Sequence, residues 1–188
     1  MNNINLDAAL EAMIAGGIIC YPTEAVFGLG CDPDNEKSVT QLLNVKQRDI
    51  SKGLILIADN YGQCLSYVDD AKIPMDKRAD IFSSWPGPVT WLLPAKASTP
   101  KWLTGRNDTI AIRISAHPVV KALCQKLGKP LVSTSANISG QEPVHSLLQA
   151  RQTFGEQIAC FVAGDLGGNS APSQIKHALS GATIRGNE

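Results

Sequence analysis

The sequence predicts an α/β fold, because segments with helical and strand periodicity alternate along the chain. Two segments identify the sheet. Leu54–Ala58 is a continuous apolar run, typical of a strand covered on both faces. Ile110–Ser115 alternates, with its three isoleucines on one face. No repeat, low-complexity tract or linker divides the 188 residues, so we expect one domain spanning residues 1–188.

The first half of the chain contains two predicted helices and one predicted strand before Leu54. The first helix covers residues 6–15, with Leu6, Leu10, Met13 and Ile14 on one face, and Gly16 and Gly17 end it. A short strand follows over Ile18–Tyr21 and stops at Pro22. The second helix is capped by Asp34 or Asn35 and runs to Lys46, with a buried stripe of Val39, Leu42 and Leu43.

In the middle of the chain, residues 74–84 are predicted to be a short helix docked by Ile81 and Phe82. The Trp85–Pro88 segment forms a stiff turn into a strand over Val89–Leu93.

The last third again alternates helix and strand. His117 and Pro118 start a helix over Val119–Leu127, and Leu131-Val132 is a strand that runs into a polar loop, Ser133–Asn137. The remaining expected elements are a helix from the Ser146 cap to Phe154, a strand over Ile158–Ala163, a glycine-rich and serine-rich loop to Ser173, a helix near Ile175–Leu179 and a strand over Thr183–Arg185.

Composition limits the possible functions. Hydrophobic residues make up 44% of the chain and charged residues 18%, as in ordinary globular proteins. Seventeen basic side chains balance seventeen acidic ones, so any anion site must be local. No apolar run approaches the ~20 residues of a membrane span. Met1–Leu10 lacks the basic start of a signal peptide.

The five cysteines are widely spaced and form no CxxC pair, which argues against a zinc knuckle and a disulfide framework. We expect reduced thiols, most of them buried, and a cytoplasmic location.

Common catalytic signatures are missing. The chain has no GxxxxGK[ST] motif, and Gly28-Leu29-Gly30 lacks the third glycine of a dinucleotide-binding fingerprint. His117, His145 and His177 are interpreted as structural or solvated, and no HExxH motif or carboxylate cluster predicts a protein-ligated metal. An enzyme with this sequence would work by positioning and charge stabilisation, without a covalent intermediate.

A cationic cluster is the first positive signal. Lys46, Arg48 and Lys52 lie between a predicted helix end and a buried strand. Lys46 and Arg48 could simply complement the helix macrodipole. That explanation leaves out Lys52, which precedes Gly53, a residue that lets backbone approach a phosphate. A planar arginine fork together with lysine point charges suits polyphosphate oxygens.

Two further signals lie near predicted strand ends. The Ser133–Asn137 loop offers hydroxyl, amide and backbone N–H groups that can hold phosphate, although it could be only a polar turn. Arg113, inside a strand, is costly to bury without an anion, and a structural salt bridge is the competing explanation. Thr23 and Glu24 add a hydroxyl and a carboxylate beside the same sheet. Together these features predict a local site for a nucleotide polyphosphate; that it serves to activate a small carboxylate is at this point only a guess.

Several motifs in order also carry a family resemblance. They are Tyr21-Pro-Thr-Glu-Ala-Val-Phe-Gly-Leu-Gly30, Lys46-Gln-Arg48 with Lys52-Gly-Leu54, Trp85-Pro-Gly-Pro-Val-Thr90, Ile112-Arg113, His117-Pro118 and Ser133-Thr-Ser-Ala-Asn137. Over about residues 6–185 the chain strongly resembles the YrdC-like family, in particular its short bacterial branch. The resemblance implies a twisted sheet, mixed or mostly parallel, flanked by helices and with a concave, cationic face.

The resemblance also implies an activity. L-Threonine, bicarbonate or carbon dioxide, and ATP would give threonylcarbamoyl-adenylate and pyrophosphate, with Mg²⁺ accompanying the ATP. A downstream tRNA-modifying enzyme complex would use the product to form N6-threonylcarbamoyladenosine at position 37 of ANN-reading tRNAs. By position, the resemblance assigns catalysis to Lys46, Arg48 and Lys52. It assigns ATP to those three residues with Ser135, Asn137, Ser173 and Arg185, and threonine to Thr23 and Arg113.

Two departures from the family pattern matter. Many members have threonine and tyrosine where this chain has Ala25 and Phe27, so a hydroxyl contact is missing there. The chain also ends soon after Arg185, so we expect no extra C-terminal domain.

Two other functions stay open. One is an RNA-binding or ribosome-maturation protein that uses the same cationic concavity, with weak RNA or tRNA binding. Zero net charge and 5% aromatic residues argue against tight binding of this kind. The other is a nucleotide-binding regulatory module that has kept the fold without turnover.

Overall fold

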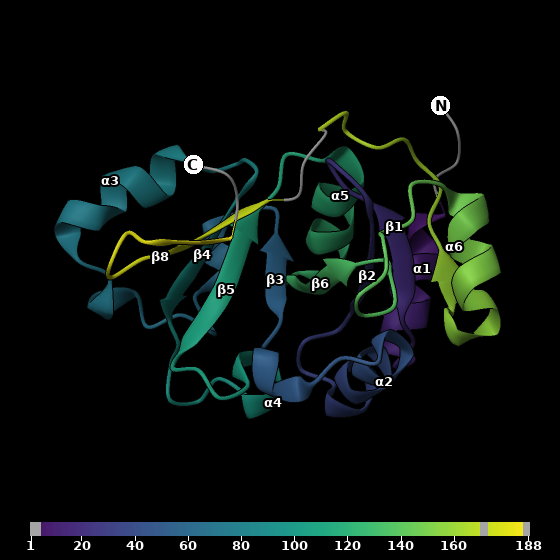
Figure 1. Cartoon of the computed structure of the whole chain (residues 1–188), viewed down its shortest axis with the longest axis horizontal. Coiled ribbons are helices and arrows are strands. Elements are labelled where there is room, and N and C mark those ends of the chain that lie inside the picture. The colour runs from purple at the N-terminus through teal and green to yellow at the C-terminus, as the bar shows by residue number, and fades with distance from the viewer. Residues whose placement is uncertain (1–4, 170–172, 186–188) are drawn as a thin grey trace.

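The computed structural model describes residues 5–169 and 173–185. Within these residues, nine strands form one sheet in the order β7-β1-β2-β6-β3-β5-β4-β8-β9, and helices flank it (Figure 1). Five of the eight strand pairs are antiparallel and three, β1 with β7, β3 with β5 and β4 with β8, are parallel. The sheet is therefore mixed, as expected, and the parallel pairs do not predominate.

The strands are short and follow most of the predicted segments. They are β1 Ile19–Pro22, β2 Phe27–Cys31, β3 Ile55–Ala58, β4 Val89–Pro94, β5 Thr109–Ile114, β6 Leu131–Ser135, β7 Cys160–Phe161, β8 Gln174–His177 and β9 Thr183–Arg185.

The described helices begin and end close to the predicted signals, except α4, which was not predicted. They are α1 Leu6–Ile14, α2 Glu36–Lys46, α3 Met75–Ser83, α4 Lys101–Thr104, α5 Pro118–Leu127 and α6 Leu147–Phe154. Asn35 and Ser146 cap α2 and α6 by accepting backbone N–H groups, and Gly128 ends α5 in the left-handed conformation. The predicted stripe of α2, Val39, Leu42 and Leu43, is buried.

The two faces of the sheet are covered differently. Because side chains alternate along a strand, Leu56 and Ile57 of β3 face opposite ways. Leu56 belongs to a large core that includes side chains of α2, α3, α4 and α6, whereas Ile57 packs in a smaller core with side chains of α1 and α5. The face that carries Ile57 and Ile55 is left partly open, and this open part forms a pocket.

Three local predictions were wrong. The segment near Ile175–Leu179 is the strand β8, not a helix, because it pairs with β4. Ile14 does not join the buried face of α1, since its exposed fraction is 69%. Ser133–Ser135 belong to β6, so the polar loop begins only at Ala136.

The cysteines agree with the prediction of reduced, buried thiols, since all five are free and buried. Burial raises the pKa of the Cys20 thiol to about 12. Such thiols are poor nucleophiles. Among the described helices, none is long and apolar enough to cross a membrane.

Candidate active site

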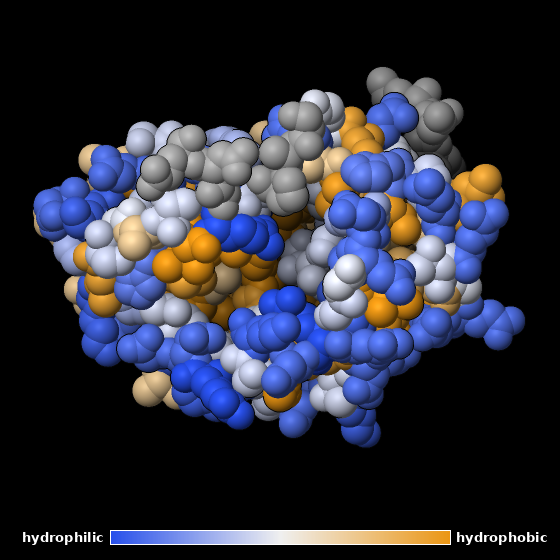
Figure 2. Space-filling model, in the orientation of Figure 1, coloured by the Kyte–Doolittle hydropathy of each residue, from blue (hydrophilic) through white to orange (hydrophobic). Residues whose placement is uncertain are grey.

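A pocket of about 540 Å³ opens on the uncovered face of the sheet. Ser133 of β6, Ile55 of β3, Ala111 of β5 and Leu92 of β4 are register partners across neighbouring strands, and all four line it. Figure 2 shows the hollow, with apolar surface inside and hydrophilic surface around it. The volume suits a small-molecule ligand. The pocket thus lies across the sheet face, and not only at the carboxyl ends of strands as the sequence suggested.

Four cationic side chains line this pocket: Arg48, Lys52, Arg113 and Arg185. Arg48 Nη2 donates to the Gly53 carbonyl oxygen at 3.0 Å, which fixes the guanidinium against the turn that carries Lys52. Burial and the positive charge of Arg185 lower the pKa of Arg48, and burial and the charge of Arg113 lower the pKa of Arg185. Four like charges around one pocket favour an anionic ligand.

The Nε atoms of Arg48 and Arg113 are buried and have no hydrogen-bond partner among the described residues. Unpaired buried donors are costly. An anion or ordered water beside these guanidinium groups would relieve that cost.

Lys52 differs from Arg48 in being exposed. It ends the short 3-10 helix Ile50–Lys52, which Asp49 caps through the Ser51 N–H group. Within the described part of the chain, no hydrogen bond or ion pair holds the Lys52 ammonium group, so it is free to meet a ligand.

Lys46 is not among the residues that line the pocket; it is buried beneath the polar loop with an exposed fraction of 2%. Its Nζ donates to the carbonyl oxygens of Ser135 and Asn137, and to Asn137 Oδ1 at 3.1 Å. Burial, followed by the positive charge of Arg48, lowers the pKa of Lys46 to about 8. The sequence grouped Lys46 with the phosphate-facing cations, whereas its contacts give it a loop-holding role.

Ser135 and Asn137 do lie at the pocket, and Lys46 fixes their loop from behind. Ser135 Oγ donates to Asn137 Oδ1 at 2.6 Å, and Asn137 Nδ2 donates to the carbonyl oxygens of Ile138 and Gln141. The amide of Asn137 is therefore occupied in shaping the loop, while the hydroxyl of Ser135 remains able to accept.

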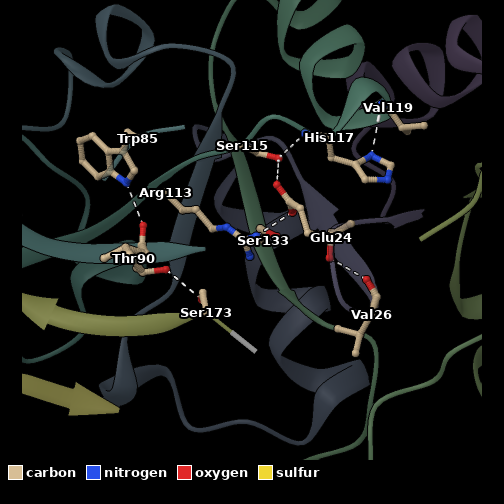
Figure 3. Close-up of polar contacts among 12 residues, drawn as sticks. Glu24, Val26, Trp85, Thr90, Arg113, Ser115, His117, Val119, Ser133 and Ser173 are labelled. Atoms are coloured by element: carbon tan, nitrogen blue, oxygen red, sulfur yellow. Dashed lines mark hydrogen bonds and ion pairs between the residues drawn. The ribbon is translucent and has the colours of Figure 1, made fainter. Parts of the chain in front are cut away.

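Arg113 forms the salt bridge that was the competing explanation for it, and it also faces the pocket. Its Nη2 lies 2.6 Å from Glu24 Oε2, and Ser115 Oγ donates to Glu24 Oε1 at 2.6 Å (Figure 3). The structure thus contains the salt bridge, and the Arg113 guanidinium still borders the cavity.

The other predicted site residues also lie at the pocket. Thr23 lines it, although its hydroxyl donates to the Val26 carbonyl oxygen at 2.7 Å. Ser173 lines the far side, where its hydroxyl pairs with Thr90 Oγ1 at 3.1 Å (Figure 3). The Ser173 carbonyl oxygen accepts from Arg185 Nη2 at 3.2 Å. Tertiary structure thus joins segments from both ends of the chain.

Sequence reasoning missed part of the pocket wall. Thr104, Asn107 and Thr109 line the cavity near Lys52, and Ile175 and Ile184 add apolar surface. Ordinary Thr, Asn and Ile residues carry no functional signal of their own.

The histidines have no arrangement that suits a nucleophile–base pair. His117 is buried and begins α5, where Nδ1 accepts the Val119 N–H group and Nε2 contacts the Asp165 carbonyl oxygen. His145 is exposed. His177 Nδ1 accepts from the Ser180 N–H group. These contacts are structural.

In the described residues, no group of three or more His, Cys, Asp or Glu side chains could hold a metal ion. Glu142 is the one carboxylate among the described residues that line the pocket. A Mg²⁺ ion here would therefore depend mainly on phosphate oxygens and water.

The fold and the pocket define a class: an α/β protein with a cavity across an open sheet face that is lined by cationic side chains. A family model for Sua5, YciO and YrdC proteins, described as "Telomere recombination", matches residues 11–185. The chain belongs to this Sua5/YciO/YrdC family.

Curated relatives cover nearly the whole chain. The chain is 63% identical over 179 residues to a protein of Pseudoalteromonas translucida named "Threonylcarbamoyl-AMP synthase", with 95% of this chain and 96% of that protein covered. It is 51% identical over 187 residues to a protein of the same name from Escherichia coli K12, with 98% of each chain covered.

Solved structures share the fold. The crystal structure of P. abyssi Sua5 complexed with L-threonine matches with a TM-score of 0.86 and 27% identity over 95% of this chain. This chain spans only 52% of that protein. E. coli YciO, at 22% identity and a TM-score of 0.75 over 92% of this chain and 82% of that one, supports the fold alone.

Proposed function

We propose that the protein catalyses the synthesis of threonylcarbamoyl-adenylate and pyrophosphate from L-threonine, bicarbonate or carbon dioxide, and ATP. The observation that carries the proposal is 51–63% identity, over nearly the full length, to proteins named for this reaction. The pocket agrees with it, since it offers cations for a triphosphate and for a carboxylate.

The nucleotide phosphates are assigned to the side of the pocket formed by Arg48, Lys52 and Ser135. Arg48 and Lys52 would offset the charge that develops on the departing pyrophosphate. Lys46 would act from below, because its three hydrogen bonds hold the loop that presents Ser135 and Asn137. Ser173 and Arg185 would lie beside the nucleotide on the far side of the pocket.

Threonine is assigned to Arg113 and Thr23. A guanidinium can bind a carboxylate through two parallel hydrogen bonds. Within the described residues, the Arg113 guanidinium uses one hydrogen bond, to Glu24. The P. abyssi Sua5 structure named above holds L-threonine on the same fold.

The chemistry needs positioning more than a side-chain nucleophile. The threonine amine adds to carbon dioxide and loses a proton to give a carbamate. A carbamate oxygen then bonds to the α-phosphorus of ATP as the bond from that phosphorus to the pyrophosphate oxygen breaks. In-line placement and charge neutralisation are the main requirements of such a step. Mg²⁺ on the polyphosphate would add further charge neutralisation.

The location of the protein and the use of its product follow from this activity. The single domain would act in the cytoplasm and pass its adenylate to a tRNA threonylcarbamoyl-transfer enzyme complex, which modifies position 37 of ANN-reading tRNAs. The adenylate is a mixed anhydride, so a nearby acceptor enzyme is chemically reasonable.

The experiment is a pyrophosphate-release assay in which each substrate is omitted in turn. We expect release to require ATP, threonine and bicarbonate jointly. Release without threonine would indicate a simple ATP hydrolase, and ATP binding without any release would indicate a regulatory module.

A further inference from the structure

A chain of hydrogen bonds lies directly behind Arg113. Glu24 uses both carboxylate oxygens: Oε2 accepts from Arg113 Nη2 and Oε1 from Ser115 Oγ, each at 2.6 Å (Figure 3). The side chains of Arg113 and Glu24 are only 12% and 13% exposed. Arg113 lines the pocket, whereas Glu24 is not among the lining residues. Glu24 therefore fixes the guanidinium from outside the pocket wall.

The chain of hydrogen bonds continues from Ser115 to His117, which precedes α5. Ser115 Oγ accepts the His117 N–H group at 3.1 Å. The Nδ1 atom of His117 accepts the Val119 N–H group at 3.3 Å, so in this arrangement the ring hydrogen lies on Nε2. Nε2 can then donate to the Asp165 carbonyl oxygen, which lies 3.0 Å away.

Asp165 begins a segment, residues 165–169, that we call the strap. Its Gly167 and Asn169 N–H groups donate to the carbonyl oxygens of Thr23 and Glu24 at 3.1 and 2.9 Å. A Cβ atom at Gly167 would lie 2.9 Å from Glu24 Cα, so the strap is pressed against the backbone there. The strap thus contacts the hydrogen-bonded chain at two places, the Glu24 backbone and the His117 ring.

We propose that Glu24, Ser115 and His117 are positioning residues that orient Arg113 toward the substrate carboxylate and couple it to the strap. This inference rests on the proposed function, which assigns the carboxylate to Arg113. Threonine that bonds Arg113 would strengthen the whole chain, because hydrogen bonds in a poorly solvated network polarise one another. The strap would then be held more firmly when threonine is bound.

The charge of Glu24 has a physical reason as well. Arg48, Arg113 and Arg185 border one pocket and repel one another. A carboxylate behind Arg113 offsets part of this repulsion and keeps the guanidinium oriented. The rival reading is that Glu24 occupies the substrate's place and is displaced by it, and the two readings predict effects of opposite sign.

The test begins with Glu24→Gln, which keeps the shape of the side chain. A glutamine can still accept from Arg113 through its one oxygen, and its amide N–H can donate to the second lone pair of Ser115 Oγ, so the substitution removes the negative charge that assists the Arg113 hydrogen bond. We expect the KM for threonine to rise about tenfold, as for the loss of one charge-assisted hydrogen bond, with the KM for ATP unchanged. A lower KM for threonine would overturn the proposal in favour of displacement.

Ser115→Ala provides the second variant, and Ser38→Ala is its matched control. Ser38 is a fully buried serine whose hydroxyl donates to the Gly16 carbonyl oxygen at 2.8 Å, outside the pocket. Ser115→Ala should raise the KM for threonine alone, and Ser38→Ala should leave both KM values unchanged. Equal KM values for threonine in Ser115→Ala and the parent would contradict the proposed role of the hydrogen-bonded chain.

Hydrogen exchange gives a readout independent of turnover. In the parent protein, threonine should slow amide exchange at Gly167 and Asn169, and Ser115→Ala should remove this protection. Suppose that pyrophosphate release depends on threonine but that threonine does not change amide exchange at Gly167 and Asn169. This result would refute the coupling of Arg113 to the strap and leave the proposed function intact. Absence of threonine-dependent release in the parent protein would instead refute the proposed function.

Discussion

Lys46, Arg48 and Lys52 belong to one short cationic segment, but their side chains occupy different environments. Lys46 is buried and bonded to Ser135 and Asn137. Arg48 is half-buried and bonded to Gly53, and Lys52 is exposed. The reason is their order: Lys46 ends α2 with its side chain buried, and Lys52 ends a 3-10 turn that has no buried residue. Neighbours in sequence therefore have separate tasks.

Arg48→Ala and Lys52→Ala should each lower the kcat of pyrophosphate release by about 10²- to 10³-fold, by analogy with the loss of one preorganised donor to a developing anion. Both variants should remain folded, because neither side chain belongs to the hydrophobic cores. The measurement is steady-state pyrophosphate release, with circular dichroism as the check of folding.

Lys37→Ala is the control for these two variants, since Lys37 is an exposed lysine of α2 that does not line the pocket. It should behave like the parent. Near-normal turnover in both Arg48→Ala and Lys52→Ala would refute the phosphate site.

Lys46 should give the site a pH dependence. Its three acceptors are served by a charged ammonium group, which has three N–H donors, whereas the neutral amine has two. With a pKa of about 8, the loop should loosen and kcat/KM for ATP should fall as the pH rises above 8. NMR titration of the Lys46 side chain checks the assignment directly, and a midpoint near the usual 10.5 would contradict it.

The same pKa has the opposite effect on stability. It falls from 10.5 in the unfolded chain to about 8 in the folded one, so between these values the unfolded chain binds more protons. The contribution of Lys46 to the free energy of unfolding should therefore rise from pH 8 to 10.5 and be smallest below 8. Denaturant unfolding of the parent and of Lys46→Met between pH 8 and 10.5 would isolate the contribution of Lys46 to the free energy of unfolding.

At the scale of elements, the sheet depends on a close approach at β2. Gly30 of β2 lies opposite Ser133 of β6, and the Tyr21 ring packs over it. A Cβ atom at Gly30 would lie 2.6 Å from the Val132 carbonyl oxygen and 2.8 Å from the Tyr21 ring. This packing lets the Tyr21 hydroxyl donate to Ser133 Oγ at 2.7 Å, beneath the pocket floor.

Gly30→Ala should lower the free energy of unfolding by about 1–3 kcal/mol, because backbone and a buried ring must move apart. Gly62→Ala is the control, since its nearest neighbour is the flexible end of Asn60, at 3.0 Å. Denaturant unfolding measures both. Equal stability of the two variants would show that β2 adjusts freely.

The strands that sequence reasoning missed, β2 and β8, form through pairing with neighbouring strands that are distant in the sequence. β8 has a helix-compatible pattern, yet its backbone groups pair with β4 and β9. β2 carries two glycines, which weaken a strand signal, but it pairs with β1 and β6 on its two sides. By contrast α2 and β5 were predictable, because a cap, a stripe and an alternation are local.

At the scale of the whole molecule, seventeen basic and seventeen acidic residues leave no net charge. The cations gather at the pocket only because folding brings Arg48, Arg113 and Arg185 together. We predict that binding to unmodified RNA is about micromolar or weaker at physiological salt. A salt titration by fluorescence anisotropy measures this, and steep, nanomolar binding without ATP would favour the RNA-binding alternative.

The sequence by itself determined the α/β class, most helix boundaries and the family, because periodicity, caps and ordered motifs are local in the chain. It also identified Arg48, Lys52, Ser135 and Arg113, all of which line the pocket. Tertiary structure alone decided that the pocket crosses an open sheet face, that Lys46 lies beneath it and that Glu24 holds Arg113 from behind. Burial and pairing with distant residues fix these features, and neither is encoded in the spacing of neighbours.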